Sequence, residues 1–400
     1  MISISKLLCD AAGPGDALRY GKQAQTTSGI AHPVIDKPRP IVVWNCTGQC
    51  NLHCVHCYSS ASSNQDPPEV LNTQQAKSFI RDLVDFGVPV LLFSGGEPLL
   101  RKDIFELAGF AREQGMRIVI SSNGTLITKE IAKKIRNTDF AEVGISLDGI
   151  GERNDRFRGK NGAYKAALQG IQNCVALGQR VSLRFTITRS NYSEIPAIFD
   201  LAEREGVERI CFYHLAYVGR AIDFSQDDLS HSETRAAVDL ICERTIDLYQ
   251  RGLPKEILTV GNHADAIYLY LKLKDQDPEH AAKALALLQT NGGNNSGIRI
   301  GAVDDLGNVH ADQFWQHYSF GNVCKRKFGD IWMDTSDPLM HGLKDRKGLL
   351  KGRCAKCQYL DLCNGNLRVR AETVFDDVWA EDPACYLTDS EIGLAKWQAK

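Results

Sequence analysis

The sequence predicts an α/β protein built on a parallel sheet, with a smaller C-terminal domain that contains β-hairpins. From residue 41 onward, short apolar runs of strand character alternate with amphipathic runs of helical character, a pattern typical of right-handed β-α-β units. The glycine- and asparagine-rich stretch 291–297 interrupts this pattern, and hairpin-like structure is predicted after it. The predicted strands span residues 41–45, 89–93, 117–121, 142–147, 180–187 and 209–215.

The helices between these strands are predicted from apolar residues at helical spacing and from N-cap chemistry. Asn72 or Thr73 is placed to cap the first helix, and residues 191–194 are placed to cap the last one. The predicted helices span residues 73–86, 104–114, 129–135, 164–177 and 195–205.

Four segments are expected along the chain. Residues 1–40 are interpreted as an irregular N-terminal leader that packs over the fold, since they offer turn residues and no chemistry; the alternative is a segment that covers the substrate. The α/β unit occupies residues 41–224. Residues 225–296 look helical, carry no motif and are expected to bridge to the C-terminal domain at 297–400.

Composition excludes several classes of protein. With 43% hydrophobic and 24% charged residues the chain has ample material for a core, and its net charge of −2 gives no support for non-specific nucleic-acid binding. It contains no apolar run of about 18 residues, so no membrane span is predicted. A cytoplasmic location is expected, where 13 cysteines point to metal binding before disulfides.

Three cysteines converge on the loop that follows the first predicted strand. Cys50, Cys54 and Cys57 have C-x3-C-x2-C spacing. Three thiolates suit a [4Fe-4S] cluster whose fourth iron stays open to another ligand. The alternative is structural zinc, which needs a fourth ligand; the nearby candidates are Cys46, His53 and His56.

This spacing resembles the signature of the radical S-adenosylmethionine (SAM) superfamily, and residues 93–98, Phe-Ser-Gly-Gly-Glu-Pro, resemble its second motif. The resemblance implies a partial (β/α)6 barrel, with the cluster on Cys50, Cys54 and Cys57 and SAM chelated to its open iron. It further implies that Ser94, Gly95, Gly96 and Glu97 form the segment that holds the methionine amino group. Tyr58 is an expected adenine contact.

Polar residues at the ends of later strands are further candidates, because the carboxyl ends of barrel strands carry function. Taken alone, Asn123-Gly124 and Asp148-Gly149 are ordinary turn pairs. Beside the cluster, they resemble the family's contacts to ribose and carboxylate. Arg184 alternates with apolar residues and is expected to bind a carboxylate bidentately. The candidate SAM contacts are Ser122, Asn123, Ser146, Asp148, Arg184 and, through a tight backbone turn, Gly219.

A second cysteine array lies near the C-terminus. Cys354, Cys357, Cys363 and Cys385 have C-x2-C-x5-C-x21-C spacing, which closes a site completely. Four cysteines are also a common zinc site. The array resembles the auxiliary-cluster domain of the SPASM and twitch subgroups, which implies a second [4Fe-4S] cluster. Leu367 stands where that pattern has a further cysteine, so one auxiliary cluster is predicted, with Cys324 either as a spare thiol or in place of one of the four ligands.

Longer stretches, including residues 44–61, 299–315 and 351–366, resemble the NirJ-like radical SAM family of haem d1 biosynthesis. This implies removal of propionate side chains from a didecarboxysiroheme, a tetrapyrrole substrate, with a flavodoxin- or ferredoxin-type electron donor. The alternatives are a haem-biosynthesis relative that removes acetate side chains or decarboxylates a porphyrin, a SPASM peptide maturase, and a non-catalytic iron-sulfur or zinc scaffold. Arginines suit substrate carboxylates; the candidates are Arg153, Arg156, Arg158, Arg299, Arg353, Arg368 and Arg370.

Overall fold

A ten-stranded sheet organises the protein in the computed structural model, which describes residues 1–21, 39–63 and 70–394. Its order is β1-β8-β7-β6-β5-β4-β3-β2-β9-β10. Strands β2 to β8 and β9 are mutually parallel, while β1 and β10 pair antiparallel at the two edges. The strands are β1 (Ile2–Ser3), β2 (Ile41–Asn45), β3 (Val90–Ser94), β4 (Arg117–Ser122), β5 (Glu142–Ser146), β6 (Val181–Ile187), β7 (Arg209–His214), β8 (Glu256–Val260), β9 (Ile300–Val303) and β10 (Val309–His310).

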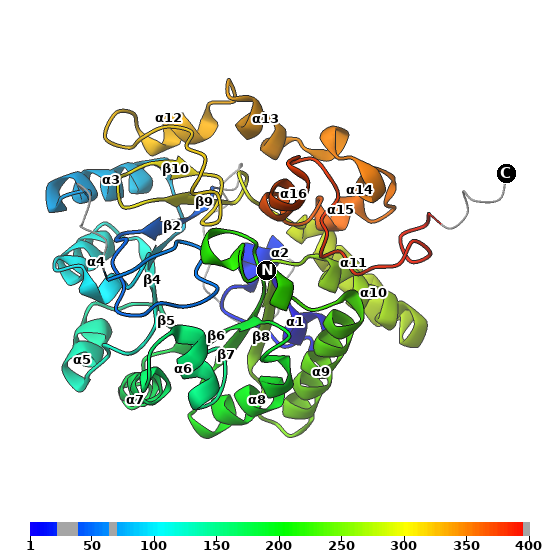
Figure 1. The fold of residues 1–400 in the computed structure, drawn as a ribbon, viewed down its shortest axis with the longest axis horizontal. Coiled ribbons are helices and arrows are strands. Elements are labelled where there is room, and N and C mark those ends of the chain that lie inside the picture. Colours follow the sequence, from blue (N-terminus) through cyan, green and yellow to red (C-terminus); the bar gives the residue numbers. More distant parts are fainter. Residues whose placement is uncertain (22–38, 64–69, 395–400) are drawn as a thin grey trace.

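The sheet curves without closing, so the predicted partial barrel is confirmed. Helices follow the strands and surround the outside of the sheet (Figure 1). They are α3 (Thr73–Phe86), α4 (Ile104–Glu113), α5 (Lys129–Asn137), α6 (Glu152–Arg158), α7 (Ala163–Val175), α8 (Ile195–Arg204) and α9 (His231–Gln250). Asn72 caps α3 in a capping box, as predicted. Helix α8 has no side-chain cap, because Asn191 instead accepts a hydrogen bond from Thr188 N.

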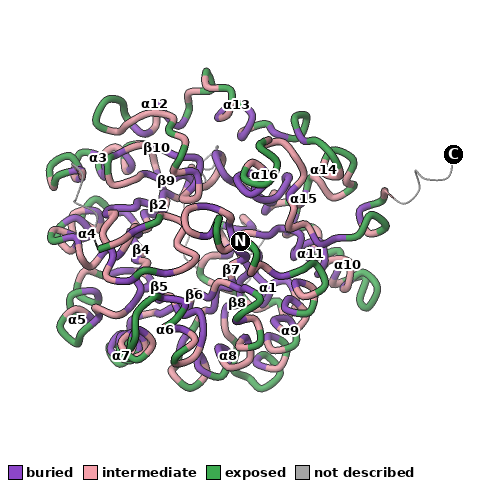
Figure 2. Tube along the Cα trace, viewed as in Figure 1, coloured by how far each residue is buried: buried purple, intermediate pink, exposed green. Residues whose placement is uncertain are grey.

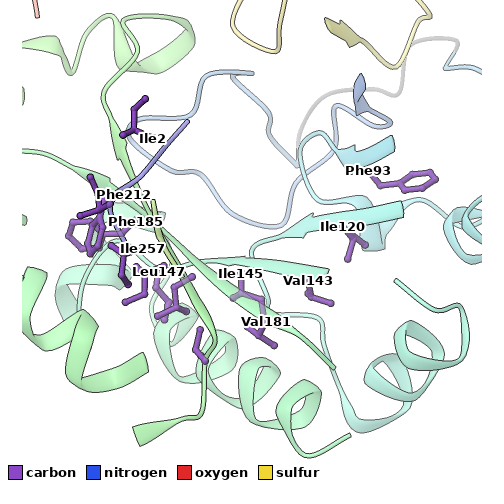
Figure 3. Packing of buried hydrophobic residues seen from close by; sticks show 14 of the residues in the cluster. Ile2, Phe93, Ile120, Val143, Ile145, Leu147, Val181, Phe185, Phe212 and Ile257 are labelled. Atoms are coloured by element: carbon purple, nitrogen blue, oxygen red, sulfur yellow. The ribbon is translucent and has the colours of Figure 1, made fainter. Parts of the chain in front are cut away.

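Alternation along the strands separates the core from the inner face of the barrel. Buried residues run through the layer between strands and helices (Figure 2). Phe185 on β6 and Phe212 on β7 pack edge to face with ring centroids 5.8 Å apart (Figure 3). Their neighbours along the strands, such as Arg184 and Tyr213, point to the opposite face. The inner face is therefore free to carry polar side chains.

The N-terminal segment is more ordered than the sequence indicated. Residues 22–38 of the predicted leader lie outside the described residues. Residues 2–20, however, form β1, α1 (Ile4–Cys9) and α2 (Asp16–Tyr20), and β1 extends the sheet beside β8. Arg19 forms ion pairs with Asp16 and with Glu256 on β8. The expectation of an irregular leader is therefore wrong for these residues, because they complete one edge of the sheet.

The segment predicted as a helical bridge also contributes a strand. Helices α10 (Ala264–Gln276) and α11 (Pro278–Asn291) follow β8, which the sequence analysis did not predict. The expected hairpin is β9–β10, but β9 also joins the main sheet beside β2. The C-terminal region continues with α12 (Phe328–Met333), α13 (Pro338–Lys344), α14 (Gly352–Lys356), α15 (Leu360–Cys363) and α16 (Arg368–Phe375). No helix of the described ranges is long and apolar enough to cross a membrane.

Candidate active site

A cavity of about 380 Å³ lies on the inner face of the barrel. That volume falls within the range of small-molecule sites. Its walls combine all three cysteines of the first array with polar side chains from the carboxyl ends of β3, β4, β5 and β6. The sequence-predicted residues that line it are Cys50, Cys54, Cys57, Tyr58, Ser94, Gly95, Gly96, Ser122, Asn123, Ser146 and Arg184.

The cysteine loop is held by a neighbouring loop. Arg220 donates from Nε to the carbonyl oxygen of Cys54 at 2.8 Å, and from its backbone N–H to that of Cys57 at 3.0 Å. Gly219 has φ +59°, and a Cβ there would lie 2.5 Å from the carbonyl oxygens of Cys57 and Tyr58. A side chain at Gly219 would thus displace the loop. Gly219 does not line the cavity, so its role here is this close packing.

Donor groups surround the three thiols. Leu52 N donates to Cys50 Sγ at 3.4 Å, and Arg158 Nη1 donates to Cys54 Sγ at 3.5 Å. The Cys57 Sγ lies 3.4 Å from the Ser59 hydroxyl. Such donors stabilise sulfur that carries negative charge.

Burial keeps the thiols protonated unless a metal binds them. Burial raises the pKa of Cys50 to about 11 and raises that of Cys54, so both are neutral without a cation. Iron would replace these protons. Within the described ranges, no three His, Cys, Asp or Glu side chains are arranged to hold a single metal ion. That is compatible with a cluster, in which each thiolate binds a different iron. Three free thiols on one cavity wall fit such a group.

Glu97 lies behind the cavity wall. Its carboxylate is fully buried and accepts hydrogen bonds from Leu99 N at 3.1 Å, Ser122 Oγ at 2.9 Å and Asn123 N at 2.7 Å. Burial raises the pKa of Glu97 to about 7, against the effect of these donors. Glu97 therefore joins the ends of β3 and β4. Three of the four lone-pair sites of this carboxylate are used internally, and the predicted contact with a methionine amino group stays a prediction.

Asp148 occupies a similar position behind the thiols. It is fully buried, accepts a hydrogen bond from Thr186 N at 2.7 Å and forms an ion pair with Arg158. His56 Nε2 lies 3.5 Å from the same carboxylate. The predicted direct contact between Asp148 and SAM stays a prediction. Asp148 acts through Arg158, which it orients toward Cys54.

Two predicted ligands, Tyr58 and Arg184, line the cavity and differ in how fully their polar atoms are paired. Tyr58 donates its hydroxyl to Asn45 Oδ1 at 3.0 Å and lies 3.3 Å from Ser94 Oγ. Arg184 donates from Nη1 to Ser121 Oγ at 2.6 Å, while its buried Nε has no partner among the described residues. Arg184 thus has donors left for an anionic ligand.

The sequence analysis missed several cavity residues. Arg117, at the start of β4, lines the cavity and forms no ion pair within the described part of the chain. Burial lowers the pKa of Arg117, which an incoming carboxylate would offset. Alternation along β4 and β7 was the signal available for finding Arg117 and its neighbours. The other missed lining residues include Arg209, Cys211, Tyr213 and Phe314.

Two of the arginines proposed as substrate contacts are structural. Arg370 is fully buried, pairs with Asp382 at 2.8 Å and donates to the carbonyl oxygen of Leu215 at 2.8 Å. Arg368 is also fully buried and donates to the carbonyl oxygens of Val378 and Ala380. Neither lines the cavity. Arg368 instead connects parts of the C-terminal region, and Arg370 also connects that region to the barrel.

Comparison with known proteins agrees with this arrangement of thiols. The family model of the radical SAM superfamily matches residues 44–202. The chain is 56% identical over 396 residues to the Fe-coproporphyrin III synthase of Methanosarcina barkeri, covering 98% of this chain and 99% of that protein. The chain belongs to the radical SAM superfamily. A radical SAM enzyme carries a [4Fe-4S] cluster and uses SAM, and Cys50, Cys54 and Cys57 fit the cluster.

Two other relatives of this radical SAM enzyme are informative. The pre-heme d1 synthase of Dinoroseobacter shibae is 43% identical over 362 residues, covering 90% of this chain and 89% of that protein. The crystal structure of Streptococcus suis SuiB bound to S-adenosylmethionine has a TM-score of 0.69 at 18% identity, covering 88% of this chain and 78% of that one. The second likeness concerns the fold alone.

The enzyme has a second, much smaller cavity in its C-terminal region. It measures about 20 Å³ and is lined by Cys354, Cys357, Cys363 and Cys385, so it is too small for an organic substrate. Tyr359 N donates to Cys357 Sγ at 3.4 Å. Burial raises the pKa of Cys385 to about 11 and raises that of Cys363. The four predicted ligands thus come together, while Cys324 is exposed and does not line this cavity.

Proposed function

We propose that this radical SAM enzyme belongs to haem biosynthesis and removes acetate side chains from a didecarboxysiroheme to form iron-coproporphyrin III. Coproporphyrin III keeps its propionates, so the reaction leading to it must spare them. The supporting comparison is the 56% identity to a named Fe-coproporphyrin III synthase across nearly the full length of both chains.

The structural observation that supports this proposal is the cationic character of the cavity wall. Arg117 on β4 and Arg184 on β6 line the cavity and form no direct ion pair among the described residues, although Glu142 lies near enough to act on both electrostatically. A guanidinium in such a site retains donors for an anionic ligand. A macrocycle with several carboxylates would supply these anions, and bidentate pairing would fix its orientation.

The chemistry divides between cofactor and protein. With its cluster and SAM bound, the enzyme has a 5′-deoxyadenosyl radical available for hydrogen abstraction. Cys50, Cys54 and Cys57 hold the cluster. Ser94, Gly95, Gly96, Ser122, Asn123 and Ser146 line the cavity and would contact SAM, and Tyr58 would contact its adenine. Arg117 and Arg184 position the macrocycle so that only one type of side chain is placed for reaction.

The second cysteine site is proposed to hold an auxiliary [4Fe-4S] cluster of the SPASM or twitch type. Its four thiols are free and line one cavity, with Tyr359 N donating to a sulfur. A closed site with four ligands suits electron transfer, because no position remains for substrate. Structural zinc is the alternative for this donor set. A flavodoxin- or ferredoxin-type protein is the proposed external donor.

A second candidate function is propionate removal on the way to haem d1. It is favoured by the 43% identity to a pre-heme d1 synthase over 90% of this chain. The two reactions would share the radical and the class of macrocycle, and they differ in which side chain is lost.

Anaerobic turnover of the reconstituted enzyme distinguishes the two candidates. Didecarboxysiroheme, SAM and a reductant are supplied, and 5′-deoxyadenosine and macrocycle mass are followed. Loss of acetate with formation of iron-coproporphyrin III is expected. Loss of propionates would establish the haem d1 function instead. Formation of 5′-deoxyadenosine without any change in the macrocycle would overturn the proposed substrate.

A further inference from the structure

We propose that His214 donates the proton that completes release of the side chain, and that Asp265 and Tyr386 hold it in position. This inference rests on the proposed function, because it concerns the fate of the carboxymethyl group. The role is new to the site, since the cluster and SAM contacts do not involve His214.

His214 stands at the carboxyl end of β7 and lines the main cavity while remaining 8% exposed. Its Nε2 lies 2.9 Å from Asp265 Oδ2. Asp265, at the start of α10, is fully buried and accepts a second hydrogen bond from the Tyr386 hydroxyl at 2.8 Å. One carboxylate oxygen of Asp265 therefore binds the His214 imidazole, and the other binds the Tyr386 hydroxyl.

This arrangement fixes the tautomer of the imidazole. Asp265 accepts a proton from Nε2, so the neutral ring leaves Nδ1 bare. In the described part of the chain, Nδ1 of His214 has no hydrogen-bond partner, and it is not among the atoms sealed away from the cavity. A buried acid that orients a histidine through one nitrogen and leaves the other for reaction is the geometry of general acid–base catalysis.

The position of the triad links the two cysteine sites. Tyr386 follows Cys385, a proposed ligand of the auxiliary cluster, whereas His214 faces the main cavity. Leu215, next to His214, is itself tied to the C-terminal region through its carbonyl oxygen, which accepts from Arg370 at 2.8 Å. The other histidine on the cavity wall, His56, lies on the cluster loop and faces the buried Asp148.

Acetate release needs both an electron and a proton. Removal of a hydrogen atom from the ring carbon next to the substituted one leaves an unpaired electron there. Homolysis of the bond to the carboxymethyl group then forms a ring C=C bond and a carboxymethyl radical. One electron from an iron-sulfur reductant, the auxiliary cluster or a ferredoxin-type protein, and one proton from Nδ1 of the imidazolium convert that radical to acetate. His214 returns to the neutral form with Nε2–H still on Asp265.

The test compares His214→Ala and His214→Gln with Asp265→Asn and Tyr386→Phe in the fully reconstituted enzyme. His310→Asn is the control, because His310 is also buried but does not line the main cavity. The readouts are the ratio of 5′-deoxyadenosine to iron-coproporphyrin III, the KM for the macrocycle, and rescue of His214→Ala by added imidazole.

We expect the ratio to rise on the order of 100-fold in both His214 variants, as for loss of a general acid. Smaller rises are expected in Asp265→Asn and Tyr386→Phe, with imidazole restoring product in His214→Ala. A ratio in the His214 variants equal to that of His310→Asn would overturn the inference. If His214→Ala fails to retain iron, the ratios in Asp265→Asn and Tyr386→Phe decide. Failure of the proposed function is a separate result, because the wild-type enzyme would then form no iron-coproporphyrin III.

Discussion

The two cysteine sites of this protein differ in the number of thiols and in the space around them. The first site offers three thiols on the wall of a cavity of about 380 Å³, and the second offers four thiols around about 20 Å³. Three ligands leave one iron of a cluster open, whereas four leave none. The first site therefore has room for a substrate and would leave one iron open, whereas the second site has neither feature.

The largest expected effect is loss of the first cluster. Cys54→Ser should lower 5′-deoxyadenosine formation by about 1,000-fold or more, because cleavage of SAM depends on the cluster. Bound iron should fall by about half while the second site remains loaded. The measurements are iron content and 5′-deoxyadenosine after anaerobic reconstitution, with Cys174→Ser, a buried cysteine outside both cavities, as the control. Unchanged SAM cleavage in Cys54→Ser would show that Cys54 does not hold the cluster that cleaves SAM.

Loss of the second site should separate SAM cleavage from product formation. In Cys357→Ser we expect iron-coproporphyrin III to fall by about 100-fold, while 5′-deoxyadenosine falls less, since the second site does not bind SAM. Cys324→Ser is the matched control, because Cys324 is exposed and lies outside the four-thiol cavity. Equal loss of both products in Cys357→Ser would show that the second site is needed for SAM cleavage as well as for product formation.

The arginines of the main cavity should affect substrate binding. Arg117→Gln and Arg184→Gln are each expected to raise the KM for the macrocycle by about 10- to 100-fold, since hydrogen bonds between charged groups contribute about 1.5–3 kcal/mol. Arg136→Gln, an exposed change on α5, is the control. Wild-type KM values in both cavity variants would show that the substrate carboxylates lie elsewhere.

The last effect concerns stability rather than turnover, and it is expected from Glu97 as a pH dependence. Its pKa is raised from 4.5 to about 7 in the fold, so the folded state binds more protons than the unfolded state between these values. Stability should therefore fall as pH rises from 4.5 to 7, by up to about 3 kcal/mol for this group. In Glu97→Gln this contribution should vanish, whereas Glu113→Gln, an exposed change, should retain it. Parallel thermal-unfolding curves against pH for wild type and Glu97→Gln would contradict the assignment.

The sequence predicted features that depend on neighbouring residues better than features that depend on distant parts of the chain. The helix over residues 73–86 depends on neighbours in the chain and was predicted correctly. The burial of Glu97 and Asp148 could not be predicted in this way, because it depends on partners from other strands and loops, such as Ser122 and Arg158.

Strand β8 was missed for a related reason. It begins with Glu256, which looks like a surface residue in the sequence. Its burial depends on ion pairs with Arg19 and Arg209, which come from distant parts of the chain. Local patterns thus predicted the elements and the thiols, whereas long-range pairing decided which polar residues reach the cavity.

The most direct test of the two-site account is electron paramagnetic resonance of the reduced, reconstituted enzyme with and without SAM. We predict two cluster signals. SAM should change only the signal that Cys54→Ser removes, and the signal that Cys357→Ser removes should be the same with and without SAM. A single cluster signal with zinc bound at the second site, or a response to SAM in the signal that Cys357→Ser removes, would contradict the account.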